Sequence, residues 1–171
     1  MNKYKNIDDF RKTVITVNLI YRNLENIVSK LNILTKDFLD KNEDFANNIC
    51  LRLQVIGESI NHLVKANSFI ISDYDEPWRE IVELRNIISH NYGELNPVEI
   101  TEICHNDVPK LKQTFDKIIM DNNSLKKGIA FLDGVKIFGY NLNMPADLNQ
   151  KLKDVYIELN HTDNCFSGKN S

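Results

Sequence analysis

Glycine, proline and cysteine are scarce in this sequence, with 6, 4 and 3 residues among 171. So few turn-forming residues exclude a collagen-like chain and argue against an all-β fold with many tight turns. The three cysteines include no CxxC pair, and an odd number does not close a disulfide framework, so we expect free thiols. A chain of 171 residues is nevertheless long enough to bury a core as a single domain.

Long apolar runs and an excess of positive charge are also missing. No run approaches the roughly 18 apolar residues of a transmembrane helix, and the N-terminal MNKYKNIDDFRK lacks the apolar centre of a signal peptide. We therefore expect a cytoplasmic protein with no membrane partner. Lysine and arginine number 21 against 24 aspartates and glutamates, for a net charge of −3. This balance excludes a broad basic surface, so a nucleic-acid partner would need a local site.

Apolar residues at steps of three and four predict two long amphipathic helices. The first extends from about residue 8 to 34 and the second from 44 to about 66, with the polar segment TKDFLDKNED as a loop between them. The second helix carries a further strip opposite its core stripe, so we expect contacts on both of its faces. That strip consists of Leu51, Val55, Glu58 and His62.

Helix-start signals recur after residue 70. Asp75, Asn96 and Asp107 are each followed within two residues by a proline, which is the pattern of a capped helix start. Gly93 is suited to end the first of these helices. Residues 97–120 are expected to form two short helices or one kinked helix, because a proline interrupts them. The fold class predicted up to residue 120 is therefore an all-α antiparallel bundle of four to five helices.

Residues 121–171 differ from the preceding part. GIAFLDGVKIFGYN contains two short apolar runs about Asp133-Gly134, a dipeptide suited to a β-hairpin, and residues 146–159 carry apolar residues at helical spacing. The tail from about residue 160 is expected to be disordered. We predict a helical bundle over residues 1–120 and a C-terminal extension over 121–171, of unknown role, which packs beside the bundle or contacts a partner.

An arginine lies in the middle of an apolar stripe on the third long helix. The stripe comprises Trp78, Ile81, Val82 and Ile88, and the arginine is Arg85. Its charge costs several kcal/mol of desolvation there unless a carboxylate, a phosphate or another chain satisfies it. Two interpretations stay open at this point. Arg85 pairs with a buried acid and only holds the bundle together, or it serves a binding site.

A histidine follows in the last turn of the same helix. His90 lies about 140° around the helix from Arg85, on the side of Asn86. The partial negative charge at a helix C-terminus favours the imidazolium, which suits proton transfer near neutral pH; the alternative is a simple capping role. Arg85 and His90 face different directions, so two copies crossing about a two-fold axis, or a helix broken before His90, would be needed to bring them together. We therefore expect a homodimer with the site at or near its interface.

These residues belong to a longer pattern. Arg85-Asn86-Ile87-Ile88-Ser89-His90-Asn91-Tyr92 resembles the R-x4-H-x-Y signature of HEPN domains of the HepT-like toxin family. QVIGES at 54–59, WREI at 78–81 and DVPKL at 107–111 are similar to further motifs of that family. The resemblance covers roughly residues 5–120 and leaves residues 121–171 outside.

The resemblance implies a dimeric HEPN bundle that acts as a metal-independent endoribonuclease, the toxin of a type VII-like toxin–antitoxin module. Arg85 and His90 would be the catalytic pair that promotes attack by the RNA 2′-OH, with Asn86 orienting the imidazole or the substrate. Glu58 is a supporting residue that pairs with His62 or with an arginine. Neither a metal ion nor a cofactor is implied, and the sequence shows no cluster with metal-ligand spacing.

The resemblance also implies a partner, a nucleotidyltransferase antitoxin of the MntA type. It would neutralise the toxin by transferring AMP to Tyr92, because the added bulk and negative charge lie two residues from His90 and repel RNA phosphates. The alternative function is a non-catalytic HEPN dimerisation module that is paired with a nucleotidyltransferase and binds a nucleotide or RNA without cutting it.

Overall fold

The structure, a computed structural model, describes residues 3–90, 96–132 and 150–158. These ranges consist of helices and their connections and contain no β-strand. The predicted all-α class is therefore confirmed. None of the described helices is both long enough and apolar enough to cross a membrane.

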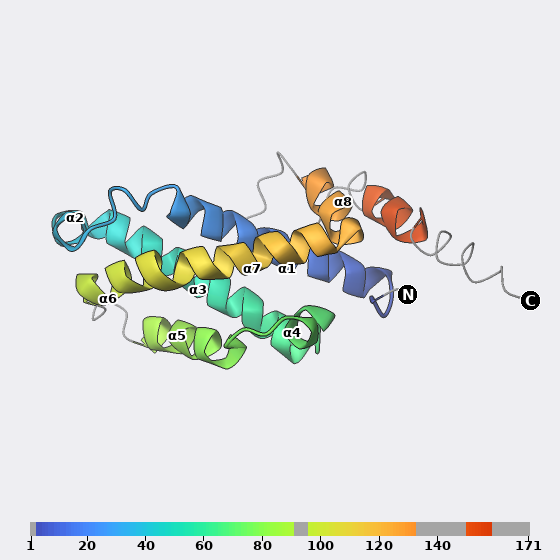
Figure 1. The fold of residues 1–171 in the computed structure, drawn as a ribbon, viewed down its shortest axis with the longest axis horizontal. Coiled ribbons are helices and arrows are strands. Elements are labelled where there is room, and N and C mark those ends of the chain that lie inside the picture. The colour runs from blue at the N-terminus through green and yellow to red at the C-terminus, as the bar shows by residue number, and fades with distance from the viewer. Residues whose placement is uncertain (1–2, 91–95, 133–149, 159–171) are drawn as a thin grey trace, which may run out of the picture.

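Three long helices form the centre of the bundle: α1 (Ile7–Val28), α3 (Glu43–Lys65) and α7 (Val108–Asp121). Helix α1 packs against α3 on one side and against α7 and α8 on the other (Figure 1). Every residue from 13 to 20 is consequently buried, polar side chains included. The core is otherwise mainly aliphatic, and it includes the fully buried rings of Phe10 and Phe115.

The first helix ends earlier than the periodicity predicts. Helix α1 stops at Val28, and residues 29–34 form turns that still bring Leu34 into the core. The Ser29 hydroxyl donates to the carbonyl of Asn26 at 2.8 Å, the kind of local bond that competes with helix continuation. The predicted loop was also wrong in part, because α2 (Lys36–Lys41) forms within it, capped by the Thr35 hydroxyl and anchored by buried Leu39.

The connection that follows α3 contains α4 (Phe69–Asp73), a short helix that was not predicted from the sequence. Helix α5 (Trp78–His90) then begins one residue after Pro77. Asp75 therefore lies outside the N-cap position that was expected for it. The predicted end at Gly93 lies outside the described residues.

Residues 97–121 form one continuous helix that contains a π-helical turn. Helix α6 (Pro97–Glu102) begins at Asn96, whose side chain accepts from the Val98 N–H at 2.9 Å as predicted. A π-helical turn, η1 (Ile103–Asp107), then leads into α7, and the Val108 N–H donates to the Ile103 carbonyl. Asp107 makes no capping bond. Pro109 has no N–H to give, and a π-turn is a known way to absorb such an interruption.

The C-terminal part adds helices to the bundle. Helix α8 (Asn123–Leu132) includes residues 128–132, where the first strand of a hairpin was expected. That expectation was wrong because Leu125, Ile129 and Leu132 at helical spacing pack into the core around α1. The remainder of the predicted hairpin lies outside the described residues. Residues 150–158 are helical as predicted, and they bury Leu152 and Val155 in the same core.

Candidate active site

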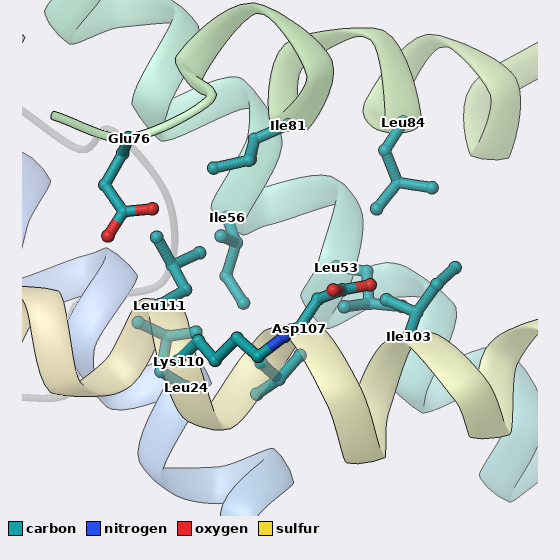
Figure 2. Close-up of a pocket in the computed structure, with 11 residues that line it drawn as sticks. Leu24, Leu53, Ile56, Glu76, Ile81, Leu84, Ile103, Asp107, Lys110 and Leu111 are labelled. Carbon is teal, nitrogen blue, oxygen red and sulfur yellow. The ribbon is translucent and has the colours of Figure 1, made fainter.

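Helix α5 rests on α3 along the lower edge of the bundle (Figure 1). An apolar pocket of about 120 Å³ lies between α5, α3 and the η1–α7 segment (Figure 2). Figure 2 shows Ile81 and Leu84 of α5 facing this pocket opposite Ile103 and Leu111, with charged Lys110 at its rim. The position of α5 therefore depends chiefly on α3, and α5 is the helix that carries Arg85.

Arg85 is oriented by two acceptors. Its Nη2 lies 2.5 Å from Oε2 of Glu58 on α3, and its Nη1 donates to Oδ1 of the neighbouring Asn86 at 2.6 Å. The contact with Glu58 is one of charge, since among the described residues Oε2 accepts no bond of hydrogen-bond geometry. The side chains of Arg85 and Glu58 remain 33% and 32% exposed. The guanidinium is thus held in place and still reachable by an anion.

Gly57 explains how the arginine reaches this position. A Cβ at Gly57 would lie 2.4 Å from the Cβ of Arg85 and 3.3 Å from the carbonyl oxygen of Ile81. Only glycine therefore lets α5 approach α3 closely enough to lay the arginine stem across it. Gly57 is part of the QVIGES segment, but no role was predicted for it. Its position could have indicated one, because a glycine in the middle of a helix costs about 1 kcal/mol relative to alanine.

Glu58 joins two basic side chains. Its Oε1 lies 3.3 Å from Nε2 of His62, one turn further along α3, while Oε2 meets Arg85. Glu58 was predicted to pair with His62 or with an arginine, and in the structure it pairs with both. The result is a connected row of three side chains, Arg85, Glu58 and His62, across two helices.

His90 is the last residue of α5, and the helix continues to it without a break. The alternative of a helix broken before His90 is therefore wrong. Five residues of regular helix separate His90 from Arg85, which corresponds to a rotation of about 140° about the helix axis. Tyr92 lies outside the described residues.

Large apolar side chains are exposed on both helices that carry the site residues. Leu51 of α3 and Ile87 of α5 are each 50% exposed. The strip of Leu51, Val55, Glu58 and His62, for which contacts were expected, is not fully covered by any described part of the single chain. Large apolar residues that stay exposed on neighbouring helices are typical of a surface that another chain covers.

Comparisons with known proteins identify relatives of the chain. Across residues 3–90, 96–132 and 150–158, no group of three histidine, cysteine, aspartate or glutamate side chains could hold a metal ion. A family model described as "Ribonuclease HepT-like" matches residues 2–118. No solved structure shows a significant match.

The relatives carry ribonuclease names. A Methanocaldococcus jannaschii protein named "Putative RNase MJ1380" is 38% identical over 84 residues, which are 46% of this chain and 74% of that protein. "Putative RNase MJ0127" of the same organism is 29% identical over 60% of this chain and 83% of its own length. "Probable ribonuclease HepT" of Thermococcus cleftensis is 31% identical over 48% of this chain and 73% of its own. The chain belongs to the HepT-like ribonuclease family.

Proposed function

We propose that this chain is a metal-independent endoribonuclease in which Arg85 and His90 are the catalytic pair. The observation that carries the proposal is the orientation of Arg85 by Glu58 and Asn86, with one third of the guanidinium side chain open to solvent. A guanidinium has five N–H donors, so two contacts leave others free for a phosphate. Family membership and the ribonuclease names of the relatives support the same reaction.

In the proposed reaction the 2′-OH of a ribose attacks the adjacent phosphorus atom. An imidazole of His90 takes the 2′-OH proton, and the resulting imidazolium returns a proton, directly or through water, to the departing 5′ oxygen. The P–O5′ bond breaks as the 2′-O–P bond forms, which leaves a 2′,3′-cyclic phosphate and a 5′-OH. Arg85 stabilises the extra negative charge on the phosphorane oxygens.

We further propose that the active form is a homodimer. A single regular α5 directs Arg85 and His90 away from each other, and a two-fold axis next to this helix would bring His90 of one copy towards Arg85 of its partner. The exposed Leu51 and Ile87 supply apolar surface for that contact. Sedimentation of the purified chain tests this proposal, and Ile87→Asp is expected to produce monomers.

The biological role that fits this chemistry is that of a toxin neutralised by a nucleotidyltransferase antitoxin. In this proposal the antitoxin transfers AMP from ATP to the Tyr92 hydroxyl and releases pyrophosphate. The added phosphate would repel RNA beside His90. Mass spectrometry after incubation with the antitoxin and ATP should show one adenylyl group, absent in Tyr92→Phe and retained in Tyr156→Phe.

The principal experiment compares RNA cleavage by the purified wild type, Arg85→Ala and His90→Ala. Both variants are expected to lose cleavage while they keep the fold. Arg79→Ala is the matched control, because Arg79 is an exposed arginine on the same helix. A wild-type protein, free of antitoxin, that cuts none of several RNAs would falsify the proposal.

One observation favours the non-catalytic alternative. Glu58 already neutralises much of the charge on Arg85, which weakens its attraction for phosphate before RNA arrives. Under this alternative, Arg85→Ala would weaken nucleotide or RNA binding, and no variant or wild type would show cleavage.

A further inference from the structure

A second pocket lies beside the row of Arg85, Glu58 and His62. It has a volume of about 270 Å³ and is formed where the first half of α1 faces the C-terminal end of α3. Its lining consists of Asp9, Lys12, Thr13 and Thr16 from α1 and His62, Leu63 and Ala66 from the other side.

The two threonines give this pocket unused hydrogen-bonding capacity. Thr13 and Thr16 are each only 5% exposed, and neither hydroxyl has a hydrogen-bond partner among the described residues. Neither hydroxyl oxygen is among the fully buried oxygens without a partner, which in the described part of the chain belong to Asn18, Glu58 and Ser59. The hydroxyls therefore open into the pocket that these residues line. A buried hydroxyl without a partner is unfavourable unless a ligand or water satisfies it.

The pocket is linked to the candidate catalytic arginine through His62. His62 is part of its lining, and Nε2 of His62 lies 3.3 Å from Glu58, whose other oxygen meets Arg85 at 2.5 Å. A group held in the pocket would therefore sit within one helical turn of the carboxylate that orients Arg85.

The size and chemistry of the pocket match a single nucleobase. A cavity of about 150 Å³ is known to accept a benzene ring, so 270 Å³ has room for one base. Leu63 supplies an apolar wall, and an imidazole such as that of His62 is a surface on which bases stack. Hydroxyls both donate and accept, which suits the mixed edge of a base.

The mouth of the pocket suits a phosphodiester. Lys12 is exposed there and makes no ion pair with the described residues. Asp9, the acid in the lining, accepts from the backbone N–H of Lys5 at 2.9 Å. The ammonium of Lys12 makes no ion pair with any side chain that the structure describes, and the Asp9 carboxylate beside it already accepts a hydrogen bond. Lys12 can therefore attract the phosphate of a nucleotide whose base occupies the pocket.

We propose that the pocket between α1 and α3 binds a nucleobase of the RNA substrate, next to the scissile phosphate, and sets a base preference for cleavage. The inference rests on the proposed ribonuclease function, since it assigns a substrate contact to that same site. Thr13 and Thr16 read the base edge, and Lys12 meets a neighbouring phosphate.

The test fills the pocket without touching Arg85 or His90. Ala66 is an exposed residue of the lining with an ordinary helical backbone, so Ala66→Phe places a ring at the mouth without strain. Val64→Phe is the matched control, because Val64 is 37% exposed and does not line the pocket. Thr13→Val with Thr16→Val is the second variant, which removes both hydroxyls while it keeps the side-chain volume.

Two measurements separate this inference from the proposed function. Titration with the four nucleoside 5′-monophosphates, followed by NMR, should show that the wild type and Val64→Phe bind at least one of them and that Ala66→Phe does not. Sequencing of cleavage ends from a random RNA pool should show a base preference that falls about tenfold in the double threonine variant.

The possible results distinguish a failure of the pocket assignment from a failure of the proposed ribonuclease function. A wild type that binds nucleotides through the pocket but cuts no RNA would overturn the proposed function and leave the pocket assignment standing. A wild type that binds no nucleotide, or an Ala66→Phe variant that binds and discriminates as the wild type does, would overturn the pocket assignment. Cleavage that continues with an unchanged preference in both variants would overturn it as well.

Discussion

Replacement of Gly57 by alanine is the sharpest test of how the arginine is positioned. The new Cβ would lie 2.4 Å from the Cβ of Arg85, about 1 Å inside ordinary contact distance. Neither atom belongs to the flexible end of a side chain, so α5 must move away from α3. Alanine gains about 1 kcal/mol in helix propensity, while overpacking costs about 1–3 kcal/mol. The net expectation is a loss of about 1 kcal/mol, or about 2–4 °C in Tm for a chain of this size.

The effect on the site should far exceed the effect on stability. A displacement of about 1 Å at a catalytic group can lower a rate about 100-fold, so we expect kcat for RNA cleavage to fall by that order in Gly57→Ala. Gly128→Ala is the control, because its Cβ would press on Val14 at 2.7 Å, away from Arg85. The control should lose similar stability, measured by calorimetry, and keep its kcat. A Gly57→Ala protein with a raised Tm and unchanged kcat would refute the reasoning.

Other substitutions test the ion pair, the core and one buried phenol. Glu58→Gln should change the free energy of unfolding, measured in urea, by less than about 1 kcal/mol because the pair is one third exposed, yet lower the cleavage rate; a loss of 3 kcal/mol or more would contradict this. Phe115→Ala should cost about 3–5 kcal/mol, since the ring is fully buried, whereas Met120→Ala, at a side chain 77% exposed, should stay within about 0.5 kcal/mol. Burial raises the pKa of Tyr4 from 10.0 to about 12, so the unfolded chain ionises first and stability should fall as the pH rises from 10 towards 12. Urea unfolding across that range should show a smaller fall in Tyr4→Phe, and an identical fall would show that Tyr4 does not contribute.

The helices were largely predictable because each one buries a continuous apolar stripe. The periodicity located α1, α3 and α5 within a few residues, except where local side-chain bonds decided the end. Ser29 ends α1 by bonding a carbonyl of the preceding turn, which periodicity alone does not show. Asp133-Gly134 predicted a hairpin, but the apolar residues before it also fit a helix, and packing against α1 selected the helix. Short apolar runs leave this choice open until their tertiary partners are known.

The site was predictable in its residues but not in its construction. Arg85 stood out as a charge in an apolar stripe, and the spacing of Glu58 and His62 indicated a pair. Glu58 contacts both Arg85 and His62, and Gly57 permits the contact with Arg85. That contact depends on how closely α3 and α5 approach each other, which the sequence does not show. The buried hydroxyls of Thr13 and Thr16 were missed for the same reason. A threonine in an amphipathic helix does not indicate that the end of another helix will pack beside it and form a pocket.

The contacts of α5 with α3 and with α7 differ in how tightly they are packed, and this determines which substitutions should displace Arg85. Towards α3 the helix is in tight contact at Gly57, whereas towards α7 it leaves a pocket of about 120 Å³. A tight contact transmits a change in side-chain volume as a shift of the helix, while an unfilled pocket can absorb one. Substitutions on α3 beneath Arg85 should therefore move the guanidinium relative to Glu58. Enlarging Leu111 in the pocket should leave it in place and improve packing. The catalytic arginine in this proposal is thus set by a helix other than its own, and the glycine and glutamate of α3 work with it as one unit.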